Sequence, residues 1–228
     1  MKQEIKDEAI EQLEKDILFG FENGDDLLES ISEMFYDESD FDEKWLKQEI
    51  DIRLKKHQTE SLKWEKPTDF DRLVKSFDEL NKNKIVSLHR AGYTKSDGEE
   101  DCSEIIAELK EIGISAKGYC YYHTQDLERA IAKENMLFIG FDSYNRDDEL
   151  AKEVAEKIIS VLTDNGFKTK WNGSIDTRIE ILNINWKKTV DNIDYNYGRV
   201  FEIIEKYHKP EKDKIEDKNK KTFWKIWK

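Results

Sequence analysis

The sequence predicts an α+β protein in which a helical N-terminal region precedes a ferredoxin-like βαββαβ sandwich with an added C-terminal hairpin strand. Two observations support this fold class. Apolar residues recur at helical spacing over the first 64 residues, and between residues 84 and 184 strand-like runs alternate with helical stripes as two successive β-α-β halves. The 228 residues suffice for one large domain or two small ones.

The first predicted region, residues 1–66, is acidic and reads as about three helices. One apolar stripe repeats every fourth residue and ends at Gly20, a second runs from Leu27 to Phe35, and a third helix is expected from Phe41 to about Leu62. The stripe of the first helix consists of Ile5, Ala9, Leu13 and Ile17.

The second predicted region, residues 67–186, is the α+β domain. Thr68 can cap its first helix, because a threonine hydroxyl accepts a hydrogen bond from a free N–H of the first turn. The elements expected after that helix are the strand "KIVSLH", a helix over residues 102–112, the strand "KGYCYYH", a short helix over about 125–133, the central strand "MLFIGF", a helix over 147–165, and a hairpin of "FKTKWNG" and "RIEILNINW" that turns at Asn172-Gly173.

Two shorter segments complete the predicted organisation. Residues 187–208 are expected to form a C-terminal helix, and residues 209–228 a basic flexible tail. The last nine residues, "KKTFWKIWK", place aromatic side chains at helical spacing among lysines. This pattern is compatible with docking in a protein groove, with a free tail, or with contact to an anionic membrane surface.

The net charge of −13 limits the classes of partner. Residues 1–43 hold 16 acidic and 3 basic residues, so their field repels nucleic acid and favours a cationic protein partner. The sequence has no apolar run of the roughly 18 residues that a membrane span needs, and no signal-peptide pattern at its start. We therefore expect a cytoplasmic protein without nucleic-acid binding or stable membrane association.

The stretch "GYCYYHTQDLERA" has the highest density of chemically functional side chains. If its strand and the preceding loop end at the same edge of the sheet, polar groups converge there, and this candidate binding edge consists of Tyr93, Asp97, His123, Gln125, Asp126 and Arg129. Three interpretations remain: capping of the short helix by His123 or Thr124, a ligand pocket, or catalysis. A Cys120–His123 nucleophile pair is not expected, because residues three apart on a strand face opposite sides.

Metal and cofactor sites are not expected. His89, Cys102, Cys120 and His123 suit zinc by type, but no CxxC or HxxxH spacing is present. No Walker or dinucleotide fingerprint occurs either, so no cofactor is predicted. Near the hairpin, Trp171 is expected in the core, and Arg178 is expected to form an exposed ion pair that contributes little.

Four motifs in order resemble those of one known family. They are "GFENGDDLLESISEMF", "WEKPTDFDRL" with "SFDELNKNKI" behind it, "GYCYYHTQDLERA", and "GFKTKWNGSIDTRIEI" running into "NINW". Together they resemble the bacterial domain-of-unknown-function family DUF6891 over about residues 19–187. This resemblance implies no reaction, substrate or ligand. More distantly, the expected sandwich resembles the fold of the protein regulators that inhibit ribonuclease E.

The function expected from the sequence is that of a non-enzymatic interaction or regulatory protein with an acidic surface. The alternative is a small-ligand-binding protein or an enzyme that uses the polar edge around His123 and Asp126.

Overall fold

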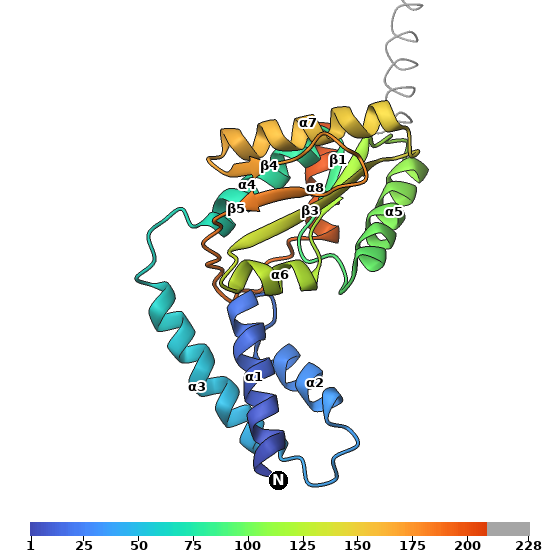
Figure 1. Ribbon diagram of the computed structural model, residues 1–228. Helices are drawn as coiled ribbons and strands as arrows, with labels where there is room; N and C mark the ends of the chain where they lie inside the picture. The colour runs from blue at the N-terminus through green and yellow to red at the C-terminus, as the bar shows by residue number, and fades with distance from the viewer. Residues whose placement is uncertain (209–228) are drawn as a thin grey trace, which may run out of the picture. The chain divides into compact units, whose positions relative to one another are not determined.

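The computed structural model describes residues 1–208, which separate into two compact units (Figure 1). The first unit consists of residues 1–71, 131–133 and 185–193, and the second of the remaining described residues. The tail predicted over residues 209–228 lies outside the described part of the chain.

Three helices, α1 (Gln3–Phe19), α2 (Gly24–Met34) and α3 (Glu43–Ser61), form the body of the first unit, and each packs against the other two. The three helices predicted from the apolar stripes are confirmed. α1 ends at Gly20, whose φ of 78° lies in the left-handed region open to glycine, and the Gly20 N–H donates to the Asp16 carbonyl oxygen at 3.0 Å.

Side-chain caps and one apolar core explain where these helices begin and how they pack. The Asn23 side chain accepts hydrogen bonds from the N–H groups of Asp25 and Asp26, and Asp42 does the same for Lys44 and Trp45. The apolar stripes meet in one core formed by Ile5, Ala9, Leu13, Ile17, Leu27, Ile31, Phe35, Leu46 and Ile50.

The segment over residues 185–193 belongs to the first unit and is not helical. The Trp186 ring packs edge-on against Phe70 at 5.3 Å, and the Lys188 ammonium lies 4.9 Å from the Phe21 ring and 5.0 Å from the Phe70 ring. These contacts lie in a stretch without regular secondary structure. The helix predicted over residues 187–208 therefore begins only at Tyr197.

The second unit contains a five-stranded sheet with helices on both faces, which confirms the α+β class (Figure 1). α4 begins in the first unit and continues into the second. The elements in chain order are α4 (Asp69–Lys82), β1 (Ile85–Leu88), α5 (Lys95–Glu111), β2 (Gly118–Tyr121), α6 (Thr124–Ile131), β3 (Met136–Ser143), α7 (Asp148–Asp164), β4 (Lys168–Lys170), β5 (Ile179–Leu182) and α8 (Tyr197–Tyr207).

The strand order is β1-β2-β3-β5-β4, with β1 and β2 parallel and every other neighbouring pair antiparallel. A ferredoxin-like sandwich contains split β-α-β units, in which another strand lies between the two strands that a helix joins. Here α5 returns the chain directly beside β1, with Ile85 paired to Gly118. The ferredoxin-like strand order predicted from the sequence is therefore not found.

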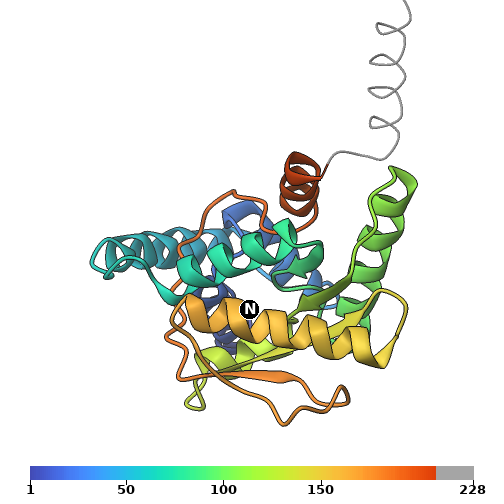
Figure 2. The same ribbon diagram turned by 90° about the horizontal axis from the view of Figure 1, so that it is seen from above.

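Alternation along the strands decides which helix each side chain meets. Cys120 and Tyr122 face α4, where the Tyr122 ring packs 6.0 Å from Phe77, and α7 packs against β2, β3 and β4. The two helices run side by side when the unit is seen from above (Figure 2). Tyr121 faces the opposite side, where Gly98 of α5 approaches its ring so closely that an added Cβ would lie 2.5 Å away.

The β4–β5 hairpin is confirmed, but its predicted two-residue turn is wrong. Lys168 pairs with Leu182 and Lys170 with Glu180, so the connection covers residues 171–178. Inside this loop the Trp171 indole N–H donates to the Ser174 carbonyl oxygen, and the Trp171 ring packs edge-on against Phe141. These contacts, with hydrogen bonds to the Asn172 side chain, stabilise a longer loop whose end places Arg178 over β3.

Candidate functional site

Asp126, in the first turn of α6, is completely buried and is the centre of a polar cluster in the second unit. Arg178 Nη1 donates to Asp126 Oδ1 at 2.8 Å and to Oδ2 at 3.1 Å, and Arg129 Nη1 donates to Oδ1 at 3.2 Å. The His123 backbone N–H donates to Oδ2 at 3.3 Å, which also caps the helix. One carboxylate therefore holds α6, the end of the hairpin loop and two guanidinium groups together.

The His123 side chain is 3% exposed and lies against the same carboxylate. Its Nε2 atom is 3.1 Å from Asp126 Oδ2 and 3.2 Å from Arg178 Nη1. Its Nδ1 atom is buried and makes no hydrogen bond within residues 1–208. Whichever ring nitrogen carries the proton, Nδ1 lacks a protein partner, which is unusual for a buried polar atom.

Burial shifts the ionisation of both partners toward their neutral forms. Burial lowers the pKa of His123 below its ordinary value, although the Asp126 carboxylate opposes this shift. Burial also raises the pKa of Asp126, against the stabilising effect of Arg178 and then of His123. At neutral pH we therefore assign His123 as a neutral imidazole.

Both arginines also lie over one aromatic ring. The guanidinium carbon of Arg178 is 4.8 Å from the centre of the Phe138 ring, and that of Arg129 is 5.7 Å from it. Phe138 belongs to β3, and its register partner on β5 is Glu180, so their side chains share a sheet face. Both guanidinium groups therefore lie within the range of a cation–π attraction to this ring.

A cavity of about 490 Å³ opens beside this cluster. Its walls come from α5, α6, β3, β5 and the hairpin loop, and eight of its nine lining residues have polar side chains. The lining residues are Lys95, His123, Gln125, Arg129, Phe138, Asp176, Thr177, Arg178 and Glu180.

A second cavity of about 260 Å³ adjoins the first. It shares four lining residues with the first cavity, Lys95, Asp176, Thr177 and Arg178, and it adds Tyr121, Gly140 and Phe141 of the sheet. Arg178 therefore lines both cavities, and the two together are named the Arg178 recess.

Comparison with known protein families identifies the family of the chain. The family model described as domain of unknown function DUF6891 matches residues 2–190. The chain belongs to the DUF6891 family. The match covers both cavities and all members of the Asp126 cluster. No curated protein and no solved structure matches the chain, so the likeness to ribonuclease E regulators stays a prediction.

Four of the six residues predicted for the binding edge of this DUF6891 protein lie together. His123, Asp126 and Arg129 are members of the cluster, and Gln125 lines the same cavity. Of the other two, Tyr93 lies in the loop before α5, and Asp97 lies in the first turn of α5.

Tyr93 and Asp97 do not line the cavity. The Asp97 carboxylate accepts hydrogen bonds from the backbone N–H groups of Tyr93 at 3.0 Å and Thr94 at 2.8 Å, which caps α5, and the Tyr93 side chain is exposed. The loop nevertheless contacts α6, because the Gly92 carbonyl oxygen accepts the Thr124 hydroxyl at 3.0 Å.

Sequence reasoning missed the role of Arg178. It was expected to form an exposed pair of little consequence, whereas its side chain is 29% exposed and its partner Asp126 is fully buried. Lys95 and Phe138 were not singled out either. Nothing in the local sequence around these residues indicates that three separate elements converge on α6.

The cysteines have no reactive character in this fold. Burial raises the pKa of Cys120 to about 12 and that of Cys102 well above its ordinary value, so both thiols stay protonated at neutral pH. Within residues 1–208 no group of three or more histidine, cysteine, aspartate or glutamate side chains is arranged to hold a metal ion. Over the same residues, no helix is long and apolar enough to cross a membrane.

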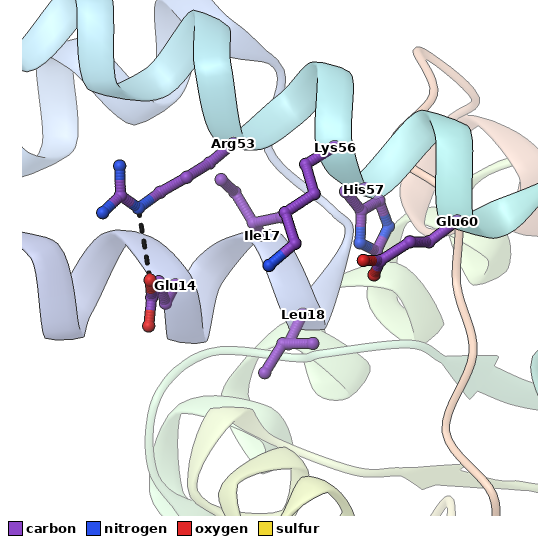
Figure 3. Close-up of a pocket in the computed structure, with 7 residues that line it drawn as sticks. All are labelled: Glu14, Ile17, Leu18, Arg53, Lys56, His57 and Glu60. Carbon is purple, nitrogen blue, oxygen red and sulfur yellow. Dashed lines mark hydrogen bonds and ion pairs between the residues drawn. The ribbon is translucent and has the colours of Figure 1, made fainter.

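The first unit contains a smaller cavity of about 210 Å³ between α1 and α3 (Figure 3). Arg53 of α3 points across it to Glu14 of α1, with Nε 3.3 Å from Oε1. The His57 ring reaches the Lys188 carbonyl oxygen at 3.0 Å through Nε2. Its two acidic and two basic lining residues balance each other in charge. Unlike His123, none of them has a buried side-chain polar atom without a hydrogen-bond partner within residues 1–208.

Proposed function

We propose that the chain binds a small polar ligand in the recess around Arg178 of the second unit. The observation that carries the proposal is the meeting of Arg178, from the hairpin loop, with His123 and Asp126 at the start of α6, beside a cavity that His123 and Arg178 line. Binding sites are typically concave and combine a few oriented polar groups with perturbed ionisation equilibria.

The proposal is supported by the way in which the cluster is built. A buried carboxylate with several donors is rigid, because each donor restricts its orientation, and a rigid site loses less entropy when a ligand binds. Purely structural capping of α6 needs only the His123 N–H bond to Asp126. Capping alone does not require Arg178, Arg129 or the buried His123 ring.

The test is a thermal-shift screen of the full chain against a broad library of small polar metabolites. We expect at least one compound to raise the melting temperature of the wild-type protein and to lose this effect with His123→Ala. Arg53→Gln, which changes a paired arginine in the first unit, is the control that should keep the effect. A library in which no compound shifts the wild-type protein would overturn the proposal.

A second proposal concerns the first unit as a surface for a cationic protein partner. The observation that favours it is the end of α2 and the loop that follows, where Met34 and Tyr36 are 55% and 81% exposed near Asp37, Glu38 and Asp40 in the sequence. Exposed apolar side chains among carboxylates suit a partner that is both basic and apolar.

This second proposal can be tested with a fluorescent peptide of alternating lysine and leucine. We expect its fluorescence anisotropy to rise with the wild-type chain at low salt, to rise less at high salt, and to rise less again with Tyr36→Ala. The control is the same peptide with glutamate in place of lysine. Equal binding of both peptides, or of neither, would contradict a cationic partner.

A further inference from the structure

We infer that the ligand of the Arg178 recess carries a carboxylate group, bound between the guanidinium groups of Arg129 and Arg178. This inference rests on the proposed ligand-binding function and names the chemical class of its ligand.

The first argument is the set of hydrogen-bond donors that the two arginines keep available. Every hydrogen bond that the Arg178 and Arg129 side chains donate within the described residues uses Nη1. The Nη2 and Nε groups of both side chains therefore remain for a ligand. An arginine presents its donors as a planar fork, and this geometry matches the two oxygens of a carboxylate.

The second argument is that both guanidinium groups are already held in place. Asp126 fixes each Nη1 group, and the Phe138 ring lies beneath both planes at 4.8 and 5.7 Å. Arginine side chains normally lose substantial conformational entropy when they bind a ligand. Here folding has restricted them before a ligand arrives, which favours tight binding of an anion.

The third argument is charge balance, which separates a carboxylate from a phosphate dianion. Two guanidinium groups share the single Asp126 carboxylate, so one positive charge remains at the pair. Among the other charged residues that line the cavity, Glu180 pairs with Lys170 at 3.2 Å and Lys95 pairs with Glu99 at 3.4 Å, whereas Asp176 is exposed. Asp176 repels any anion, but it repels a dianion about twice as strongly as a monoanion, so the cavity favours a monoanion.

The experiment uses the full chain and probes of matched shape. Benzoate and benzamide share the ring and the planar head group, but only benzoate is charged. In an NMR titration that follows the arginine Nε–H signals, we expect benzoate to shift the Arg178 and Arg129 signals with saturation. Benzamide should bind at least about tenfold more weakly, because a hydrogen bond to a charged group is roughly twice as strong as a neutral one.

Variants assign the binding to the guanidinium pair. Arg129→Gln should weaken benzoate binding about tenfold or more, and Arg178→Lys should do the same while keeping a cation beside Asp126. Because the Arg129 side chain is 46% exposed, its variant is expected to fold. Arg53→Gln is the control that should bind benzoate as the wild type does.

The outcomes separate this inference from the proposed function. If metabolites bind at the recess but phenyl phosphate or benzamide binds as well as benzoate does, the carboxylate assignment is overturned and the ligand site stands. If benzoate shifts the signals equally in wild type and Arg129→Gln, the arginine pair is not the site. If no library compound and no benzoate bind, both the function and the inference fail.

Discussion

Arg178 and Asp126 are 52 positions apart in the chain and form an ion pair of 2.8 Å with the carboxylate completely buried. The pair joins the end of the hairpin loop to the first turn of α6. A change to either residue therefore affects both the hairpin loop and α6.

Asp126→Asn should lower the free energy of unfolding by about 2 to 4 kcal/mol. Removal of one partner of a buried pair typically costs 3 to 5 kcal/mol, and the partial exposure of both arginines reduces this figure here. Urea unfolding followed by circular dichroism measures the change. Asp176→Asn, an exposed carboxylate on the same cavity, is the control and should change stability by less than about 0.5 kcal/mol. Equal effects of the two variants would contradict the anchoring role of Asp126.

Stability should fall as the pH drops below about 6.5, and His123 should account for part of the fall. The folded protein holds His123 neutral because burial lowers its pKa, whereas the same side chain in the unfolded chain takes up a proton near its ordinary pKa of 6.5. Protonation therefore favours unfolding. Melting temperatures at pH 7.5 and 5.5 should differ less in His123→Asn than in the wild type. An identical pH dependence would show that His123 does not contribute.

Gly98→Ala should destabilise the second unit by about 1 to 3 kcal/mol, although alanine normally favours a helix over glycine. The new Cβ atom would lie 2.5 Å from two carbons of the Tyr121 ring, which is itself buried. Gly24→Ala in α2 is the control, because its Cβ would meet only the Leu54 and Ile50 side chains, at 3.4 and 3.7 Å. Thermal unfolding compares them, and a stabilising Gly98→Ala would show that Tyr121 can move aside.

Lys188→Met should leave the stability of the first unit unchanged within about 1 kcal/mol or raise it. Burial of the Lys188 ammonium disfavours its charged form and lowers its pKa, against the attraction of Asp191, and methionine fills a similar volume without this penalty. Lys188→Ala should instead lower stability by about 2 kcal/mol or more, because it leaves a cavity between the Phe21 and Phe70 rings. Urea unfolding measures both, and an equal loss would mean that the ammonium group itself stabilises the unit.

Local features of the fold were predictable from the sequence. The apolar stripes predicted the helices of the first unit, and the polar start of "HTQDLERAI" predicted α6 to within about two residues at each end. These features depend on neighbouring positions, where capping and helical periodicity operate.

Non-local features were not predictable in the same way. Alternation identifies a strand, but it does not identify the neighbour of that strand, so the position of β2 beside β1 could not be deduced. Likewise, "TRIEIL" contains nothing that shows Arg178 turning back to Asp126. Of the candidate site, sequence reasoning found the residues carried by α6 and missed those brought to it by the sheet and the hairpin loop.

The return of residues 185–193 to the first unit means that this unit is not encoded by one continuous stretch of the gene. A fragment ending at residue 71 would contain α1, α2 and α3 but would lack Trp186 and Lys188, and the Phe21 and Phe70 rings would lose their cover. Newly exposed aromatic surface promotes aggregation. Residues 1–71 therefore cannot be transferred to another protein as a complete unit. Recombination that separates them from residues 185–193 would disrupt the first unit.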